Sequence, residues 1–363
     1  MAATIIIKGQ MHYIQNKKLG YDRDHVMVMN IDQKIIDKID LFKLELKSNG
    51  NILAVSKANS SPVNIAGGYS MNRGDINSAQ AMNTRGNPID DEYIRVNGME
   101  LIAGSDLGKQ DILDANKEDY AKNYYHYIIN ESAAKALGWK PGEAIGKKMF
   151  LGEQRPGIVK GVIKDFHFAS LHNPIEPLVL FPGGWGNILM VKVSGNDLSK
   201  TIAFMQNKWK QLAPHRPFEY RFMDEDFNKL YDSELRTAKV FNIFSAIAIL
   251  LACLGLFGLS AYSARQRIKE IGIRKVLGAS AGSITFLLSN SFIKLVLIAF
   301  IIAIPLVWFV MNKWLQDFAY RISISWWMFA LAGLLALVIA LITVSFQAIK
   351  AAVANPVKSL RAE

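Results

Sequence analysis

The chain has 363 residues, of which 51% are hydrophobic and 20% are charged, and its single cysteine is Cys253. The cysteine count excludes a disulfide framework and a cysteine-based zinc cluster, and the composition excludes a disordered or collagen-like chain. The formal net charge is +11, but residues 240–363 hold 11 Lys and Arg against 3 Asp and Glu. This concentration of charge in the apolar third favours a membrane segment over a nucleic-acid-binding protein, which would carry its basic stripe on a soluble fold.

Residues 8–235 are predicted to form a mixed α/β domain. The residue patterns predict strands at 25–31, 52–57, 158–168, 189–193 and 218–222, and helices at 33–47, 131–137 and 199–212. Residues 59–90 are rich in Asn, Gly, Ser and Asp, which is typical of loops and short edge strands. From about Asp224 the pattern is helical and meets no breaker before Val240. It predicts one continuous helix that ties this domain to the first apolar segment.

Catalytic motifs are missing from this sequence. It contains no Gly-x4-Gly-Lys-Ser/Thr loop for ATP phosphates, no Gly-x-Ser-x-Gly elbow and no His-Glu-x-x-His zinc motif. One constellation deserves weighing: Asp165 and His167 would share a face of the strand at 158–168, and His172 follows after a turn. A metal centre needs three or four convergent ligands, so we favour a hydrogen-bonded strand end over a metal-dependent hydrolase. We expect no catalytic residue, no metal and no cofactor.

The last third of the chain contains three candidate membrane spans. Apolar runs cover residues 240–262, 292–311 and 326–346, and the first of them holds no charged residue. At about 1.5 Å per residue, such a run makes a helix of about 34 Å, which crosses a hydrocarbon core of about 30 Å. An all-α membrane domain of three helices is therefore predicted to follow the α/β domain.

The connecting segments predict the orientation of these spans. The loop at 265–291 and the tail at 347–363 are strongly basic, whereas the loop at 312–325 carries only two basic residues and Asp317. Because positively charged loops stay in the cytoplasm, the 265–291 loop and the tail are predicted to be cytoplasmic. The α/β domain and the 312–325 loop are then extracytoplasmic.

Four sequence segments resemble one protein family. RQRIKEIGIRKVLGAS at 265–280 closely resembles the cytoplasmic loop of the FtsX-like permeases of ABC transporters, and NPVKSLRAE at 355–363 resembles their C-terminal tail. VIKDFHFASLH at 162–172 and LGYD at 19–22 look like the MacB-type periplasmic core domain found in Bacteroidetes-like permeases. The resemblance covers essentially the whole chain and is strongest at 265–280.

The resemblance implies a multi-pass permease subunit of the cell inner membrane, with a MacB-type core domain at 8–235 and an FtsX-like permease domain at 236–363. ATP would be bound by a separate cytoplasmic ATPase, so the chain itself would be no enzyme and would need no cofactor. Members of this superfamily export peptides and macrolides, extract lipoproteins, or signal to cell-wall enzymes, and many work by mechanotransmission. The implied partners are the ATPase, a second permease half or copy, membrane lipid and a periplasmic adaptor, with no nucleic acid.

The chain departs from the family pattern at its start. In the family a first span precedes the extracytoplasmic domain, but here only a short apolar run stands before Lys8. That run is too short for a span of about 20 residues and for the core of a signal peptide. We therefore expect residues 1–7 to be the remnant of a transmembrane helix and the chain to be a piece of a longer permease.

Residues 265–280 are the predicted site of ATPase coupling. They should form a short helix, because glycines at 272 and 278 weaken longer helices, and its apolar ridge should dock on the ATPase. The candidate residues are Arg267, Ile268, Lys269, Glu270, Ile271, Arg274, Lys275, Val276 and Leu277. A simpler interpretation is that the basic residues only fix topology. The alternative function is a membrane-anchored sensor or scaffold that regulates a partner without transport.

Overall fold

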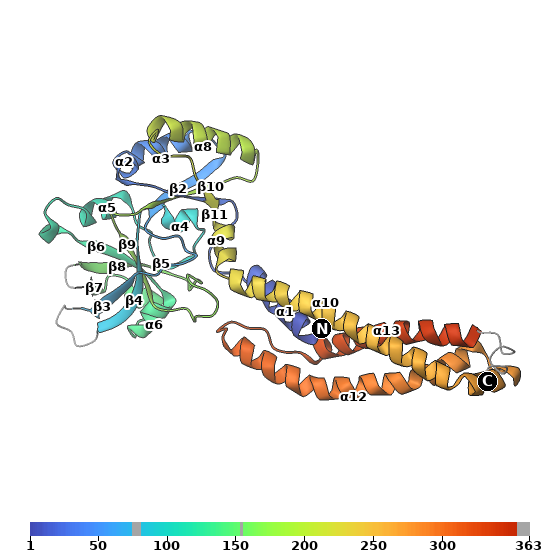
Figure 1. Cartoon of the computed structure of the whole chain (residues 1–363). Helices are drawn as coiled ribbons and strands as arrows, with labels where there is room; N and C mark the ends of the chain where they lie inside the picture. Colours follow the sequence, from blue (N-terminus) through green and yellow to red (C-terminus); the bar gives the residue numbers. More distant parts are fainter. Residues whose placement is uncertain (75–80, 153–154, 354–363) are drawn as a thin grey trace. The chain divides into compact units, whose positions relative to one another are not determined.

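The computed structural model describes residues 1–74, 81–152 and 155–353 (Figure 1). Within these residues the chain forms two compact units. The α/β unit consists of Lys17–Asp232, and the helical unit combines Met1–Asn16 with the residues from Ser233 onward. The predicted fold class, an α/β domain followed by a helical membrane domain, is confirmed. The residues of the predicted tail motif, 355–363, lie outside the described residues.

Helix α1 (Ala2–Asn16) places the start of the α/β unit at residue 17, where residue 8 was predicted. The apolar face of α1 does not stop at Lys8, because Ile7, Met11 and Ile14 continue it at helical spacing and are all buried. The helix contacts α12 and α13 of the helical unit. Residues 8–16 therefore belong to the helical unit, and residues 1–7 are one part of a helix of 15 residues.

The first lobe of the α/β unit is an antiparallel sheet covered by helices. Its strands follow the order β11 (Arg221–Phe222), β1 (Val26–Asn30), β10 (Ile188–Val193) and β2 (Ile52–Ala58). The covering helices are α2 (Gln33–Ile36), α3 (Ile39–Lys47) and α8 (Leu198–Leu212). Phe42 of α3 and Trp209 of α8 are fully buried, and their rings meet edge to face at 5.7 Å. This aromatic pair holds the two helices on the sheet.

The second lobe is a small closed barrel. Its strands pair in the ring β4 (Ala81–Ile89), β3 (Gly68–Arg73), β7 (Lys148–Leu151), β8 (Pro156–Ile163), β6 (Tyr125–Asn130) and β9 (Leu178–Pro182). Strand β9 closes the ring by pairing in parallel with β4, and β5 (Leu101–Gly104) adds to β8. Ring closure leaves no open sheet edge among these six strands. The barrel joins the first lobe where Ala58 of β2 pairs with Ile89 of β4.

Short helices complete the barrel lobe. They are α5 (Lys109–Ala115), η1 (Tyr120–Lys122), α6 (Glu131–Ala136) and α7 (Pro141–Ala144), whereas α4 (Tyr93–Val96) packs against β2 and β10 of the first lobe. Asn130 caps α6, because its side chain accepts a hydrogen bond of 2.9 Å from the Ala133 N–H. Two predicted strands are shorter than expected. The strand at 158–168 ends at Ile163, and the strand at 218–222 is reduced to its last two residues.

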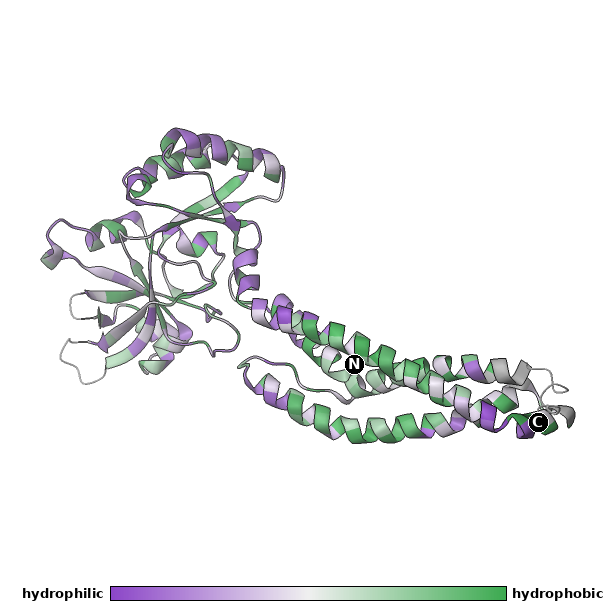
Figure 2. Cartoon of the chain, viewed as in Figure 1, coloured by the Kyte–Doolittle hydropathy of each residue, from purple (hydrophilic) through white to green (hydrophobic). Residues whose placement is uncertain are grey.

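The helical unit contains the three predicted membrane helices. Its helices besides α1 are α10 (Asp232–Gln266), α11 (Ile268–Val276), α12 (Ala281–Gln316) and α13 (Trp326–Val353). Residues 232–266, 282–316 and 326–347 are long and apolar enough to cross a membrane, which confirms the three spans (Figure 2). α12 packs along α13, and a Cβ at Gly333 would lie 2.7 Å from the Phe300 ring. A small residue here lets the two helices approach closely.

Gln10 connects α1 to the segment between α12 and α13. Its buried side-chain amide donates to the Tyr320 carbonyl at 3.0 Å and accepts from the Ile322 N–H at 2.9 Å. The chain leaves the helical unit shortly afterwards, at Asn16. The end of α1 that leads into the α/β unit and the α12–α13 loop therefore lie at the same end of the helical unit.

The predicted continuous helix from Asp224 into Val240 is wrong. Helix α9 (Met223–Lys229) ends before α10 begins at Asp232. The N–H groups of Leu230 and Tyr231 bond to carbonyls three residues earlier, at 3.1 Å and 3.0 Å, which is a turn and not an α-helix. The break coincides with a packing constraint, because Tyr231, one of its two residues, is buried in the α/β unit. A hydrophobic pattern alone could not reveal that constraint.

Gly20 offers a test of the packing at the start of the α/β unit. Its φ is +88°, and a Cβ there would lie 2.7 Å from Phe166 Cβ and 3.0 Å from the Asp165 carbonyl. Gly138 also has a positive φ, +73°, but a Cβ would meet nothing within 4 Å. We expect Gly20→Ala to lower the free energy of unfolding by about 1–3 kcal/mol more than Gly138→Ala, because only Gly20→Ala adds a clash to the backbone strain. Urea titration of both purified variants measures the difference. Equal losses would contradict this packing.

Candidate functional site

Helix α11 forms the predicted site, at the end of the helical unit that α10 and α12 share. It is short, as predicted, and runs from Ile268 to Val276. Gly278 ends it with a φ of +90°, and the Ala279 N–H bonds back to the Arg274 carbonyl at 2.9 Å. Ser280 then caps α12, because its hydroxyl accepts from the Ser283 N–H at 3.2 Å. Because Gly278 ends α11 and Ser280 begins α12, α11 is a helix separate from α12.

The apolar residues of α11 do not form one ridge. Ile271 is only 6% exposed and packs against Ile284 of α12 and Ala279, so it anchors the helix to its own unit. Leu277 is 80% exposed, and Ile273, which the sequence analysis did not include, is 53% exposed. The signal for Ile273 was present in its i, i+4 spacing from Leu277.

The outward side of α11 combines these apolar residues with charge. Lys269 precedes Ile273 by four residues and is also exposed, whereas Ile268 is 38% exposed. Glu270 and Arg274 pair at 2.8 Å, and because both side chains are solvated the pair is worth only a few tenths of a kcal/mol. Arg267 is exposed, and the side chains of Lys275 and Val276 are outside the described ones. We call Lys269, Ile273 and Leu277 the outward face of α11.

The structure does not gather Asp165, His167 and His172 at one point. All three follow the end of β8, so Asp165 and His167 do not share the face of a strand. Asp165 accepts from the N–H and the hydroxyl of Ser132, at 3.0 Å and 2.6 Å. It thereby serves the first turn of α6.

The two histidines have different surroundings. Burial, with help from Lys17, lowers the pKa of His167 to about 4, so this ring is neutral at physiological pH. The His172 ring stacks on Tyr231 at 6.4 Å. A search of the described residues finds no group of three His, Cys, Asp or Glu arranged to hold a metal ion.

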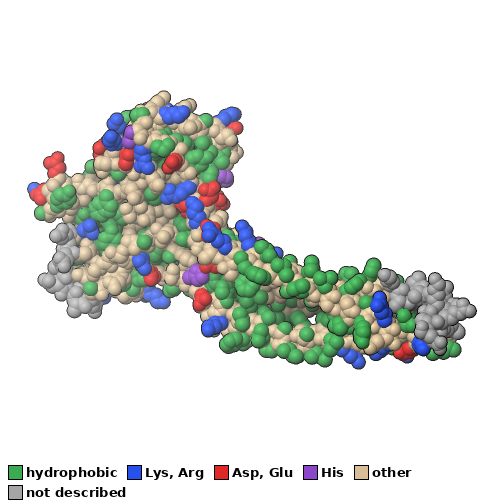
Figure 3. Space-filling model, viewed as in Figure 1, with side chains coloured by type: hydrophobic (Ala, Val, Ile, Leu, Met, Phe, Trp, Pro, Cys, Tyr) green, Lys and Arg blue, Asp and Glu red, His purple; other side chains and the backbone are tan. Residues whose placement is uncertain are grey.

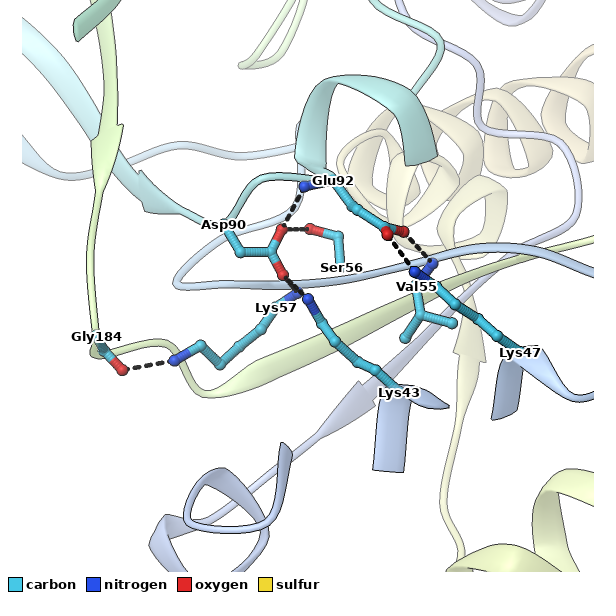
Figure 4. A network of polar contacts seen from close by, with 8 residues as sticks. All are labelled: Lys43, Lys47, Val55, Ser56, Lys57, Asp90, Glu92 and Gly184. Atoms are coloured by element: carbon cyan, nitrogen blue, oxygen red, sulfur yellow. Dashed lines mark hydrogen bonds and ion pairs between the residues drawn. The ribbon is translucent and has the colours of Figure 1, made fainter. Parts of the chain in front are cut away.

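A polar network that the sequence analysis missed joins the two lobes of the α/β unit (Figure 4). Asp90, at the end of β4, is buried and accepts from the Ser56 hydroxyl at 2.7 Å and from the Lys57 N–H and Lys43 Nζ at 2.5 Å each. Glu92 accepts from Lys47 Nζ and, at 3.2 Å, from the Val55 N–H. The carboxylates come from the barrel lobe, whereas their donors lie on α3 and β2 of the first lobe.

The electrostatics of this network indicate a structural role, in which Asp90 and Glu92 form ion pairs and hydrogen bonds between the lobes; we call these two carboxylates and their donors the clasp. Burial would raise the pKa of Glu92, but the hydrogen bonds from Lys47 and Val55 outweigh it and hold the pKa below its usual value. Burial lowers the pKa of Lys57, whose Nζ donates to the Gly184 carbonyl at 2.6 Å. A groove of about 500 Å³ lies beside the network, with Leu44 and Leu113 exposed on its walls. The Asp90 oxygens are already occupied by donors, so the network holds the lobes together.

Charged and apolar side chains are distributed differently over the two units. Figure 3 shows hydrophobic side chains covering the middle of the helical unit, and Lys and Arg at its ends. In the α/β unit, acidic and basic side chains are mixed over the visible surface. This distribution is the one expected for a lipid-crossing bundle and a hydrated domain.

Comparison with known proteins agrees with the fold. Residues 242–356 match the family model described as FtsX-like permease C-terminal. The chain is 25% identical over 294 residues to the macrolide export ATP-binding/permease protein MacB of Escherichia coli, covering 76% of this chain and 43% of that protein. It is 23% identical over 288 residues to the ABC transporter permease YknZ of Bacillus subtilis, covering 76% and 70%. The chain thus spans less than half the length of the E. coli MacB relative.

Two solved structures are similar to part of this chain, with low TM-scores. The periplasmic region of MacB from Actinobacillus actinomycetemcomitans gives a TM-score of 0.40 at 16% identity, covering 60% of this chain and 97% of that one. The extracellular domain of YknZ from Gram-positive bacteria gives 0.37 at 15% identity, covering 54% and 98%.

Asp106, which lies before α5, makes the stability of the α/β unit depend on pH. Burial, with the nearby charge of Asp91, raises the pKa of Asp106 to about 6. A raised carboxyl pKa stabilises the fold below the unfolded pKa of about 4, and this contribution is lost as the pH rises through 6. We expect Asp106→Asn to gain about 1–2 kcal/mol over the natural chain above pH 6, a figure reduced for solvent screening.

Urea titration at pH 4, 5, 6 and 7 measures the effect. Asp114→Asn is the matched control, because the pKa of Asp114 is shifted in the opposite direction. A hydrogen bond from Gln110 lowers it. This substitution should bring no gain above pH 6. A natural chain whose stability does not fall between pH 4 and 6, relative to Asp106→Asn, would contradict the assignment.

Proposed function

Residues 242–356 form an FtsX-like permease C-terminal domain, and from this premise we propose that the chain is the permease subunit of an ABC transporter. It couples ATP hydrolysis by a separate cytoplasmic ATPase to movement of its extracytoplasmic α/β unit. The observation that carries the proposal is the outward face of α11. An exposed leucine and isoleucine beside lysine, on a short helix anchored from behind by Ile271, suit a groove on a partner protein.

Charge and connectivity support the orientation. Arg265, Arg267 and Lys269 lie where α10 meets α11, which is the cytoplasmic side by the positive-inside rule. The α12–α13 loop and the end of α1 lie together at one end, through the Gln10 hydrogen bonds. α10 has 35 residues, so its two ends are about 52 Å apart and reach opposite sides of a bilayer. The chain therefore sits as a multi-pass protein in the cell inner membrane, with Lys17–Asp232 outside.

ATP binding belongs to the partner in this proposal. The 363 residues contain no phosphate-binding loop, and the relative YknZ is named a permease. The substrate class is a peptide, a macrolide-like compound or a lipoprotein, exported or extracted by mechanotransmission. A second permease half or copy, membrane lipid and a periplasmic adaptor complete the proposed set of partners, and neither cofactor nor metal is needed.

Substitutions on α11 test ATPase coupling. We expect Leu277→Asp and Ile273→Asp to reduce co-purification of the cognate ABC ATPase and its stimulated ATP hydrolysis about tenfold, because a buried carboxylate would face an apolar groove. Leu113→Asp is the matched control, since Leu113 is 63% exposed but lies on the α/β unit. It should leave both measurements unchanged. Ile271→Asp also breaks the contact with Ile284, so it is the less selective variant.

The outcome separates coupling from the alternatives. If Leu277→Asp and Ile273→Asp keep the ATPase and its stimulation, the basic residues of α11 serve topology alone. If the ATPase stays bound but no substrate-dependent hydrolysis occurs even in the natural chain, the sensor or scaffold function is favoured.

Cysteine labelling tests the orientation independently. On a Cys253→Ser background, Glu270→Cys should resist a membrane-impermeant maleimide added to spheroplasts, because α11 is cytoplasmic. Tyr120→Cys, at a highly exposed position of the α/β unit, should be labelled. Labelling of Glu270→Cys in intact spheroplasts would reverse the assigned topology.

A further inference from the structure

The groove beside the clasp lies wholly within the α/β unit, between its two lobes. Its volume is about 500 Å³, and its walls are helix α3 of the first lobe and helix α5 of the barrel lobe. The clasp residues and the segment at 183–184 complete the lining. Sites for small molecules measure about 300–1,000 Å³ and combine apolar walls with a few polar groups. The groove therefore has the size of a small-molecule site.

Apolar side chains face the groove from both walls. Helix α3 contributes Ile39 and Leu44, and α5 contributes Ile112 and Leu113. Leu44 is 70% exposed, and Leu113 is almost equally exposed, so neither leucine is needed in a core of this unit. Burying a leucine side chain is worth roughly 1.5–3 kcal/mol. An apolar ligand lying between these helices would gain part of that free energy from each wall.

Lys57 supplies a buried positive charge to the same groove. It lines the groove, is only 9% exposed, and its Nζ donates to the Gly184 carbonyl at 2.6 Å (Figure 4). Lys43 and Lys47 form ion pairs with the clasp carboxylates, but within the described part of the chain Lys57 Nζ has no such pair. An ammonium group has three donors, and a buried charge without an ion pair is costly. Lys57 therefore has donors left for an acceptor in the groove.

The electrostatics agree with this assignment. Burial lowers the pKa of Lys57, and the charge of Asp90 opposes this effect. The Asp90 oxygens cannot satisfy the ammonium, because they accept from Ser56, Lys43 and the backbone N–H groups of residues 57 and 92. A ligand with a negatively charged group would supply the missing partner for Lys57.

Three further charged residues line the groove and limit the charge of the ligand. Asp40 and Lys109 are exposed, so solvent screens both of them, whereas Asp91 is half-buried. Lys109 precedes Leu113 by four residues, which places a cation and a leucine on one face of α5. Because Asp91 repels additional negative charge, the groove suits one anionic group and not a polyanion.

The backbone around the groove favours an alkyl chain over a peptide. The N–H and carbonyl groups of α3 and α5 are used mainly within the helices. The Gly183 N–H donates to the Ile89 carbonyl at 3.3 Å, and the Gly184 carbonyl accepts from Lys57. A peptide would therefore bury amide groups that find few partners, at a cost in free energy. An alkyl chain carries no such groups.

We propose that the groove binds a fatty acid, with its alkyl chain between Leu44 and Leu113 and its carboxylate on Lys57 Nζ. The charge-assisted hydrogen bond fixes the head group, and the apolar walls hold the chain. This site goes beyond ATPase coupling and is independent of it, because every residue that forms it lies in the α/β unit.

Photolabelling of the full chain in lipid nanodiscs tests the site. The probe is dodecanoic acid with a diazirine at a middle carbon, and mass spectrometry of proteolytic fragments locates the label. We expect label on α3 or α5, and plain dodecanoate should displace it. Dodecanol with the same diazirine should label these helices about tenfold less, because its head group has no charge for Lys57. Label on the membrane helices serves as the internal reference for the amount of each probe in the bilayer.

Variants of the groove separate the charge from the walls. Lys57→Met should reduce labelling of α3 and α5 about tenfold, whereas Lys57→Arg, which keeps the cation, should retain most of it. Leu44→Asp should reduce labelling by a similar factor. Leu53→Asp is its matched control, because Leu53 is 49% exposed on β2 and lies outside the lining. It should leave labelling unchanged.

Each result decides for or against the fatty acid. Equal labelling of α3 and α5 by acid and alcohol contradicts the site in the natural chain, even if Lys57→Met does not fold. Natural labelling in a folded Lys57→Met overturns it as well. A leucine-rich peptide with a free carboxylate that displaces the probe where dodecanoate does not would assign the groove to peptides instead. No ATPase is present in these samples, so failure here leaves the proposed permease function untouched.

Discussion

Burial of Phe227 on α9 and of Tyr231 just after it marks the point at which the α/β unit ends. Phe227 and Tyr231 give up contact with water for contact with Arg23, His172 and each other, and such burial is the largest favourable term in folding. The helical hydrogen bonding is interrupted at Leu230 and Tyr231, so the break coincides with the last buried residue of the unit. The unit boundary and the start of the long apolar helix α10 depend on this one packing interaction.

A packing contact also decides which side chains are exposed at the other end of α10. Ile271 is buried against Ile284, and this contact determines which side of α11 faces away from the helical unit. Once Ile271 is turned inward, Ile273 and Leu277 are left exposed beside Lys269. Helix α10 therefore runs from the buried residue Tyr231 to α11, which leaves only part of its apolar surface exposed. The ion pairs of Asp90 and Glu92 add a third constraint, because they hold together the two lobes that meet where β2 pairs with β4.

Sequence periodicity predicted most elements whose pattern is local. Helices α8 and α6 and strands β1, β2 and β10 lie close to their expected residues. Strand β9 was missed because all five of its residues are buried, so it shows no alternation of apolar and polar residues. The closed barrel was missed for a related reason. Ring closure depends on the pairing of β9 with β4, about 90 residues apart in the chain, and no local pattern encodes that register.

By itself, the sequence determined those features that depend only on composition and on the spacing of nearby residues. Length and hydropathy determine the three apolar helices, loop charge indicates their orientation, and the segment at 265–280 identifies the FtsX-like region. Tertiary structure decided which side chains of a recognised segment are buried and which are exposed for contact with a partner. It turned Ile271 inward and left Ile273 exposed, buried Tyr231 in the α/β unit, and placed Asp165 against Ser132 of α6. The physical reason is that burial is a property of surfaces brought together from distant parts of the chain, whereas periodicity reports only which residues could share a face.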